Sequence, residues 1–232
     1  MNLAVFDLDH TLLNGDSDYL WGQFLVAHRL VDAEYYAREN QRFYDEYKAG
    51  TLDIHEFSAF SLKPLTEHPL ENLEALRARF VAEQIVPVIS RQAPALLARH
   101  RAAGDELLIT TATNRFIVEP IAAHFGVRHL LATEPERDGA RFTGRIARSN
   151  FRDAKVGNLK AWLDAHPVKF ERLSGYSDSH NDLPLLEWST HPVVVDADDM
   201  LQATSKAQGW PSISLRDNRT PAALFQQIGL AS

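Results

Sequence analysis

The chain of 232 residues contains no cysteine. That absence excludes disulfides, thiolate metal sites and cysteine nucleophiles, and it is compatible with the cytosol. Long apolar runs are also missing. The N-terminal apolar stretch is short and ends in acids, which is typical of neither a signal peptide nor a membrane helix. We therefore expect a cytoplasmic protein that does not associate with a membrane.

The chain has no concentration of basic charge either. Its formal net charge is −7, with both signs scattered along the sequence, so we do not expect nucleic acid or an anionic membrane as a partner. Hydrophobic residues make up 45% of the chain, which is enough to bury a substantial core. The length favours one full domain with an insertion. These properties leave the oligomeric state open.

The N-terminal third has two different patterns. Residues 2–6 form a brief apolar run that stops at alternating carboxylates, which predicts a buried parallel strand with acids at its C-terminal end. From 16 to 83, apolar residues recur at roughly helical spacing. Turns are expected at 50–53 and 63–66, because glycine and proline interrupt helices. We assign 1–15 and 84–232 to a core domain and 16–83 to a helical insert.

After Pro87 the pattern alternates between helix and strand in units short enough for βαβ crossovers. It predicts an α/β fold, a doubly wound parallel sheet with helices on both faces. The expected strands are 106–110, 129–133, 172–176 and 192–196, and the expected helices are 88–103, 115–125, 155–165 and 182–188. Residues 138–146 have the glycine-rich alternation of a hairpin.

In such a sheet, ligands bind beyond the C-terminal ends of the strands. Carboxylates, hydroxyls and a lysine follow the predicted strands, and they are the groups that phosphoryl transfer needs. Clustered carboxylates repel one another unless a cation lies among them, and oxygen ligands favour Mg²⁺. The residues concerned are Asp7, Asp9 and Thr11, the segment 110–114, Lys155, and the segment 177–182.

Two of these segments resemble signatures of the haloacid dehalogenase (HAD) superfamily. Asp7-Leu8-Asp9-His10-Thr11 resembles its first motif, Asp-x-Asp-x-Thr, and residues 177–182 resemble its acidic fourth motif. Ser177 and Ser179 stand where glycines are commoner. The second and third motifs are single residues, matched here by Thr111 and Lys155. The resemblance covers essentially the whole chain and points to the phosphoserine-phosphatase-like branch, subfamily IB, with the insert as its cap.

This resemblance implies a Rossmann-like HAD core that hydrolyses a small-molecule phosphate monoester through an aspartyl-phosphate intermediate. Asp7 would be the nucleophile, and Asp9 the general acid and then the general base. Thr111 would donate a hydrogen bond to the transferring phosphoryl group, and Lys155 would neutralise its charge. The residues implied to hold Mg²⁺ are Asp7, Asp9, Asp178 and Asp182. We also expect Thr11, Asn114 and His180 to contact the substrate.

The sequence also bears on the identity of the ester. Asp16 resembles the acid that meets the substrate ammonium in phosphoserine phosphatases. Those enzymes use a cap arginine for the substrate carboxylate, yet no arginine or lysine occurs between Thr51 and Leu62. An unpaired carboxylate in a closed pocket costs roughly several kcal/mol. We therefore favour an amine-bearing ester such as histidinol phosphate. Phosphoserine is the alternative, which Arg42 or Lys63 could still serve.

Two other classes of function are compatible with parts of the pattern. A phosphotransferase would use the same aspartyl-phosphate, because Asp9 could activate an alcohol instead of water. A non-catalytic phosphate-binding or metal-binding regulator fits least well, since it has no need of a nucleophile.

Overall fold

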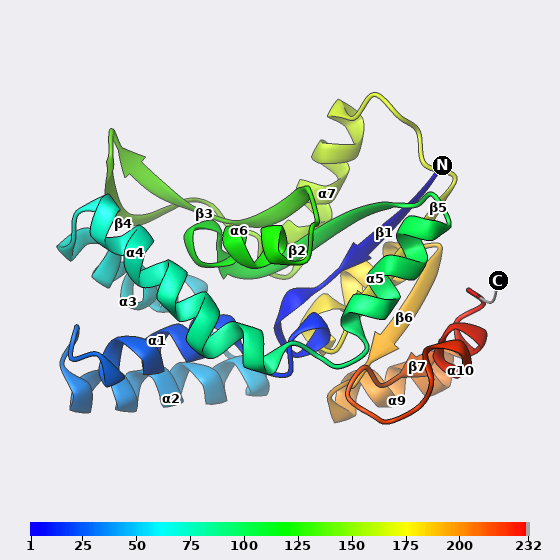
Figure 1. Cartoon of the computed structure of the whole chain (residues 1–232), viewed down its shortest axis with the longest axis horizontal. Coiled ribbons are helices and arrows are strands. Elements are labelled where there is room, and N and C mark those ends of the chain that lie inside the picture. The colour runs from blue at the N-terminus through cyan, green and yellow to red at the C-terminus, as the bar shows by residue number, and fades with distance from the viewer. Residues whose placement is uncertain (231–232) are drawn as a thin grey trace.

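The structure has an α/β fold with a mostly parallel sheet, as the sequence predicts. One further strand extends this sheet at each edge, β4 on one side and β7 on the other. The computed structural model describes residues 1–230. Within them the strands lie in the order β4-β3-β2-β1-β5-β6-β7 (Figure 1). All neighbouring strands are parallel except β3 and β4, which are antiparallel. The doubly wound fold class is confirmed.

The central strand, β1 (Asn2–Phe6), has four consecutive buried residues, as expected for a strand covered on both faces. It pairs with β2 on one side and with β5 on the other. Its C-terminal end therefore lies in the middle of the sheet edge. The other strands are β2 (Glu106–Asn114), β3 (His129–Asp138), β4 (Arg141–Arg148), β5 (Arg172–Ser177), β6 (His191–Val195) and β7 (Ser212–Ile213).

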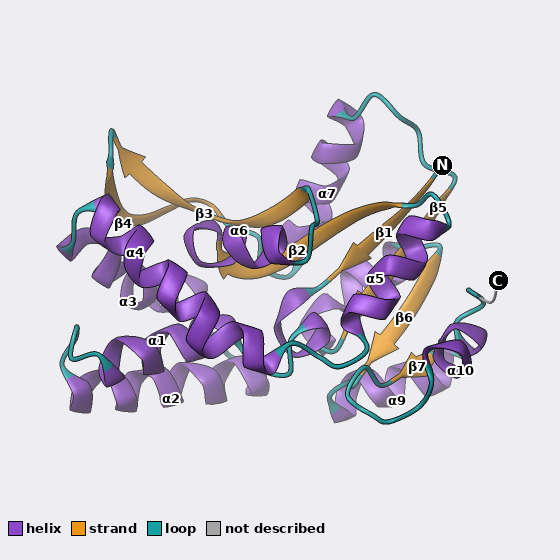
Figure 2. Ribbon diagram, viewed as in Figure 1, coloured by secondary structure: helices purple, strands orange, loops and turns teal. Residues whose placement is uncertain are grey.

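Helices cover both faces of this sheet (Figure 2). On one face Phe6 and Ile109 pack in a buried apolar cluster with side chains of α5, α6 and α10. On the other face Val5 and Leu108 pack against α7 and α8. The bounds of these helices are α5 (Ala93–Ala102), α6 (Arg115–His124), α7 (Asp153–Ala165), α8 (Leu183–Trp188), α9 (Asp199–Gln208) and α10 (Pro221–Gln227).

The insert consists of four α-helices. Three of them begin at aspartates whose side chains accept hydrogen bonds from backbone N–H groups of the first turn: Asp16, Asp32 and Asp53. Gly50 ends the second helix with a φ of 71°, a conformation that favours glycine. The helices are α1 (Ser17–Ala27), α2 (Ala33–Ala49), α3 (Ile54–Glu67) and α4 (Leu70–Phe80).

The insert leaves the core and rejoins it at neighbouring points. After α4 the chain continues through the short helices η2 (Val81–Ile85) and η3 (Val86–Val88). The returning segment then pairs with the departing one, because Leu13 forms an antiparallel bridge with Ile89. The N–H of Asn14 also donates to the carbonyl of Val88 at 2.6 Å. This arrangement agrees with our division into a core and a cap at residues 16–83, which we retain as a proposal.

A second contact joins the far end of the insert to the core. Helix α3 packs against β4, and Leu62 and Leu65 of α3 belong to the same buried cluster as Phe142 of β4. The hairpin comes so close that a Cβ atom on Gly144 would lie 3.1 Å from Cγ2 of Thr66. Gly144 also has a φ of 82°. Glycine is therefore suited to this position by both space and conformation.

Three expectations about secondary structure were wrong. The predicted turn at 63–66 lies inside α3, with Pro64 in the helix, because burial of Leu62 and Leu65 outweighs the lost backbone hydrogen bond. The predicted helix 88–103 begins only at Ala93, since Ile89 is held in the bridge to Leu13. The hairpin is longer than 138–146, because β3 continues unbroken to Asp138 before the turn.

The chain beyond β6 adds elements that the sequence pattern did not predict, namely α9, β7 and α10. Of these, α9 buries Leu201 against Leu186 and Val194. Among residues 1–230 we find no helix long and apolar enough to cross a membrane.

Candidate active site

Asp7 follows β1 directly and lies at the centre of the sheet edge. Its N–H donates to the carbonyl of Tyr176 on β5 at 2.9 Å, so the strand geometry fixes its backbone. Its Oδ1 accepts a hydrogen bond from Lys155 Nζ at 2.7 Å, and its Oδ2 accepts one from Thr11 Oγ1 at 3.3 Å. Burial raises the pKa of Asp7 to about 7, although the Lys155 charge opposes the rise.

A tight turn after β1 directs Asp9 away from Asp7. Within η1 (Leu8–Leu12), Asp9 is extended and His10 is left-handed, with a φ of 56°. Asp9 Oδ1 accepts from the N–H of Ser17 at 2.7 Å. Its Oδ2 accepts from Thr111 Oγ1 at 3.1 Å and from Thr113 Oγ1 at 2.9 Å. Two carboxylates that are neighbours in sequence therefore have separate hydrogen-bonding partners.

Lys155 lies in the first turn of α7 and contacts one carboxylate from each of the two acidic motifs. Its Nζ donates to Asp7 Oδ1 and to Asp182 Oδ2, each at 2.7 Å. Burial alone would lower the pKa of Lys155, but the charges of Asp182 and Asp7 raise it instead. Asp182 Oδ2 also accepts from Ser177 Oγ at 2.8 Å. Asp182, which we expected at the metal, thus directs its carboxylate to the lysine.

Asp178 lies across Thr11 from Asp7. Its Oδ1 accepts from Thr11 Oγ1 at 2.9 Å, so one hydroxyl faces both carboxylates. Burial raises the pKa of Asp178 well above its usual range, and the charge of Asp7 raises it further. A divalent cation between the two carboxylates would relieve both effects, and carboxylate oxygen is the ligand that Mg²⁺ prefers. The donor set of Asp7 and Asp178 therefore fits Mg²⁺.

The cap completes a pocket over Asp7 and Asp9, with an empty volume of about 600 Å³ that includes its open mouth. Helix α1 contributes Asp16 and Asp18 to the lining, and the only cationic side chain in the lining is Lys155. Burial raises the pKa of Asp16 to about 7, with a further rise from Asp9, and it raises the pKa of Asp18 well above its usual range. The remaining lining residues are Tyr19, Asn40, Phe43, Tyr44, Tyr47, Leu52, Ile54, Phe57, Thr111, Ala112, Thr113 and Phe151.

Three predicted substrate residues, Thr11, Asn114 and His180, are absent from the lining of this pocket. Thr11 is buried, with its hydroxyl between Asp7 and Asp178. Asn114 caps α6, accepting from the N–H of Ile117 at 3.3 Å, and it is absent from the pocket lining. His180 lines a neighbouring pocket, where its Nδ1 lies 2.9 Å from Asp198 Oδ2. Asn114 and His180 both belong to the expected segments, but local hydrogen bonds turn their side chains aside.

The sequence analysis did not select Asp18 and Thr113, which the structure places in the lining of the pocket. Asp18 follows Asp16 by two positions, and both lie at the start of α1, where the helix faces the pocket. Thr113 follows Thr111 by two positions, so both side chains leave β2 on the same face and reach the same oxygen of Asp9. Because side chains alternate between the two faces of a strand, the spacing of two from Thr111 could have predicted that Thr113 faces the same site.

A family model described as haloacid dehalogenase-like hydrolase matches residues 4–187. The chain belongs to this family. The HAD hydrolase described here is 39% identical over 221 residues to a histidinol-phosphatase of Neisseria meningitidis serogroup C (strain 8013), covering 93% of this chain and 99% of the relative. It is 25% identical to phosphoserine phosphatase SerB1 of Mycobacterium tuberculosis (strain ATCC 25618 / H37Rv), covering 98% of this chain and 75% of that relative.

Solved structures share the fold of this chain. A protein of unknown function from Bordetella pertussis Tohama I is 40% identical, with a TM-score of 0.86, covering 92% of this chain and 98% of the other. A phosphoserine phosphatase structure with an analogue of the phospho-aspartyl intermediate has a TM-score of 0.68 at 16% identity, covering 100% and 99%, so that likeness concerns the fold. The family model and the named relatives together support a phosphatase.

Proposed function

We propose that this HAD hydrolase cleaves a small phosphate monoester through an aspartyl-phosphate formed on Asp7. The position of Asp7 supports this proposal. It is the one carboxylate that is fixed by the sheet, touches the lysine and lines the pocket. A carboxylate is a competent nucleophile toward phosphorus when the phosphate charge is neutralised. The small phosphate ester is the only partner that we propose.

In the first step, a carboxylate oxygen of Asp7 attacks phosphorus and the ester P–O bond breaks. The bonding electron pair goes to the leaving alkoxide, which takes a proton from Asp9. In the second step, Asp9 removes a proton from water, and the water oxygen attacks phosphorus. The bond between Asp7 and phosphorus breaks, which restores the carboxylate and releases inorganic phosphate. The separate hydrogen bonds of the two acids support these separate roles.

Lys155 and the two threonines would prepare this chemistry. Lys155 Nζ already lies at Asp7, where it would offset the charge of the phosphate oxygens. Thr111 and Thr113 hold Asp9. When the substrate is bound, the single hydroxyl hydrogen of Thr111 would turn from Asp9 to the phosphoryl group, and Thr113 would keep its hydrogen bond to Asp9. When bound by Asp7, Asp178 and the backbone carbonyl of Asp9, Mg²⁺ would supply further positive charge for the phosphate oxygens. Asp182 would act by holding Lys155 in place.

The charge of the pocket carries the proposal about the substrate. Its lining contains four carboxylates, on Asp7, Asp9, Asp16 and Asp18, against the single cation Lys155. Lys155 is already shared between Asp7 and Asp182. A leaving group with its own carboxylate would thus be repelled, whereas one with amine or imidazolium groups would be attracted. We propose histidinol phosphate, and the name of the 39% identical relative supports this choice.

The test is hydrolysis of histidinol phosphate, phosphoserine and phosphoethanolamine, each with Mg²⁺ and with a chelator. We expect kcat/KM for histidinol phosphate to exceed that for phosphoserine by at least about 100-fold, since an unpaired carboxylate costs roughly 3 kcal/mol. Faster hydrolysis of phosphoserine would refute the substrate proposal. Full activity in the chelator would refute the metal proposal, and turnover by Asp7→Asn would refute the mechanism.

A further inference from the structure

Three metal-ligating side chains converge at the end of the sheet opposite the catalytic carboxylates. Glu106 begins β2, His129 begins β3, and His166 follows the last residue of α7. The register pairs Leu108 with His129, so Glu106 and His129 project from the same face of the sheet. That face is the one that α7 covers. The fold therefore brings all three side chains together although they are far apart in sequence.

The distances among them are short. Glu106 Oε1 lies 2.5 Å from His129 Nε2 and 3.5 Å from His166 Nε2. The three ligand atoms all lie within 4.8 Å of one another. Among residues 1–230, no other group of three histidine, cysteine or acidic side chains meets that separation.

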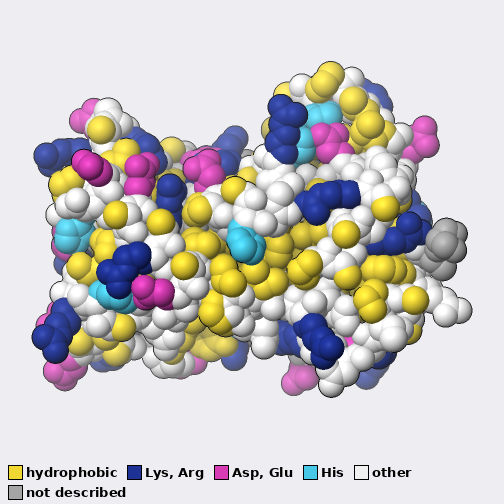
Figure 3. All heavy atoms as spheres, in the orientation of Figure 1, with side chains coloured by type: hydrophobic (Ala, Val, Ile, Leu, Met, Phe, Trp, Pro, Cys, Tyr) yellow, Lys and Arg dark blue, Asp and Glu magenta, His cyan; other side chains and the backbone are white. Residues whose placement is uncertain are grey.

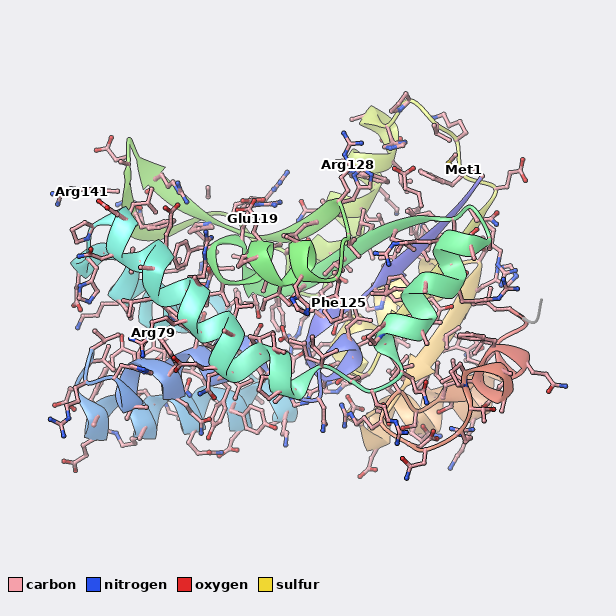
Figure 4. The ribbon with its side chains drawn as sticks, in the orientation of Figure 1. Met1, Arg79, Glu119, Phe125, Arg128 and Arg141 are labelled. Carbon is pink, nitrogen blue, oxygen red and sulfur yellow. The ribbon has the colours of Figure 1, made fainter. Side chains whose placement is uncertain are left out.

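Aromatic packing holds the two imidazoles. Trp162 lies in the last turn of α7, just before His166. The centre of its ring is 4.4 Å from the centre of the His166 ring and 5.0 Å from that of the His129 ring. Glu106, His129 and His166 side chains keep 23%, 20% and 13% of their surface exposed. The Trp162 ring thus packs against both imidazoles, and the three side chains remain partly exposed to solvent. Figure 3 shows histidine and acidic side chains beside one another over α7, and Figure 4 labels Arg128, the neighbour of His129, there.

We propose that Glu106, His129 and His166 form a binding site for a divalent transition metal of the Zn²⁺ class. Two imidazole nitrogens and one carboxylate oxygen match the ligand types of Zn²⁺, with water as the fourth ligand. Mg²⁺ prefers a shell of oxygen atoms and would not select this site. The site shares no residue with the lining of the catalytic pocket, so the proposal does not rest on the proposed hydrolysis. Its metal would tie β2, β3 and α7 together.

Loading this site requires small rearrangements. With metal–ligand distances of about 2.0–2.2 Å, tetrahedral ligand atoms lie about 3.4 Å apart. Glu106 Oε1 must therefore move away from His129 Nε2 by about 1 Å. The protons of His129 and His166 must both reside on Nδ1 to free the two Nε2 atoms for the metal. For His166 this gives up the 3.3 Å hydrogen bond that Nδ1 accepts from the N–H of Val168. Without metal, Glu106 Oε1 is hydrogen-bonded to His129 Nε2 and lies 3.5 Å from His166 Nε2.

The experiment is equilibrium dialysis of the untagged full chain against Zn²⁺ and Co²⁺, with excess Mg²⁺ to occupy the catalytic site. We expect one ion bound per chain and the intense visible absorption of four-coordinate Co²⁺. His129→Gln and His166→Gln should each weaken binding at least about tenfold, because loss of a direct ligand costs no less than loss of an outer partner. The matched control is His124→Gln, which removes an exposed histidine from α6.

Circular dichroism and kcat with Mg²⁺ would show that each variant is folded, because none of these residues belongs to the catalytic site. Equal Zn²⁺ affinity in the wild type and His129→Gln would overturn the proposal, as would no binding to the folded wild type. The group would then be only a hydrogen-bonded cluster. Neither result would bear on hydrolysis.

Discussion

Asp18→Asn tests whether the pocket recognises positive charge in the leaving group. The change keeps the size of the side chain and removes one carboxylate from the lining. We expect kcat/KM for histidinol phosphate to fall strongly. For phenyl phosphate, whose leaving group carries no positive charge, we expect little change, because Asp18 contacts neither Asp7 nor Lys155 in the hydrogen-bond network described above. The comparison of two substrates on one variant separates recognition from damage to the catalytic groups.

The size of the effect follows from the position of Asp18. A carboxylate and an ammonium about 4 Å apart interact by about 4 kcal/mol at an effective dielectric constant of 20. Two factors reduce this value. The first is that Asp16 remains in the pocket and still attracts the ammonium. The second is that the pKa of Asp18 is raised, so part of the interaction energy is needed to ionise its carboxyl. We therefore expect a loss of about 2 kcal/mol, which corresponds to about 30-fold in kcat/KM.

The assay is steady-state release of inorganic phosphate from both esters at saturating Mg²⁺. Asp164→Asn is the matched control, because Asp164 is an exposed acid of α7 outside the pocket, and we expect it to change neither rate. An equal loss on both esters would show that Asp18 supports the catalytic geometry. An unchanged rate on histidinol phosphate would show that the pocket does not recognise charge through Asp18.

Three further outcomes follow from the structure. Asp7→Asn should abolish turnover yet stabilise the metal-free protein at pH 8 by about 1–3 kcal/mol in urea denaturation, because it removes a buried carboxyl whose pKa is raised to about 7; a less stable variant would contradict this. The raised pKa values of Asp7 and Asp16 mean that the folded state holds protons more tightly than the unfolded state. Their stabilising contribution is thus complete below about pH 4 and is lost as pH rises through about 7. The melting temperature of the chelated wild type should therefore fall between pH 5 and pH 8, and Mg²⁺ should reduce that fall. Asn150→Ala should lower the free energy of unfolding by about 2–4 kcal/mol, since Asn150 Nδ2 donates to acceptors on both β2 and β3; a change below 0.5 kcal/mol would count against that reasoning.

The catalytic end of the sheet could be predicted because its rules are local. An apolar run that ends in Asp7 and Asp9 indicates a buried strand with acids at its exit, and parallel strands all present that exit at one edge. Lys155 could be predicted through its resemblance to the third motif and its place at the start of a helix. The rule for parallel strands does not apply to it, because the preceding strand, β4, is antiparallel to β3. The structure brings Lys155 to 2.7 Å from Asp7 Oδ1 across 148 positions of sequence.

The orientation of individual side chains could not be predicted. Asp182 and His180 lie in the expected segment, but each meets a partner, Lys155 or Asp198, whose approach depends on packing between elements. The N–H of Ser17 donates to Asp9 Oδ1 at the start of α1, next to Asp18 in the pocket lining. That contact between the insert and the turn after β1 has no local sign in the sequence. Pro64 shows the same limit for secondary structure, since tertiary burial of its neighbours overrides a helix-breaking residue.

The contact between α3 and β4 has a kinetic consequence for substrate exchange. The insert is connected to the core at its root, where Leu13 and Ile89 bridge the departing and returning segments, and it contacts the core again at its far end through the α3–β4 packing. The Nη1 atom of Arg77 adds a third attachment by donating to the carbonyl of Phe116 at 2.8 Å. A rigid swing about the root would have to expose the leucines that face Phe142. Exchange through small movements of α1 and α2 at the pocket mouth avoids that barrier, so the release of products is expected to depend on the mobility of those two helices.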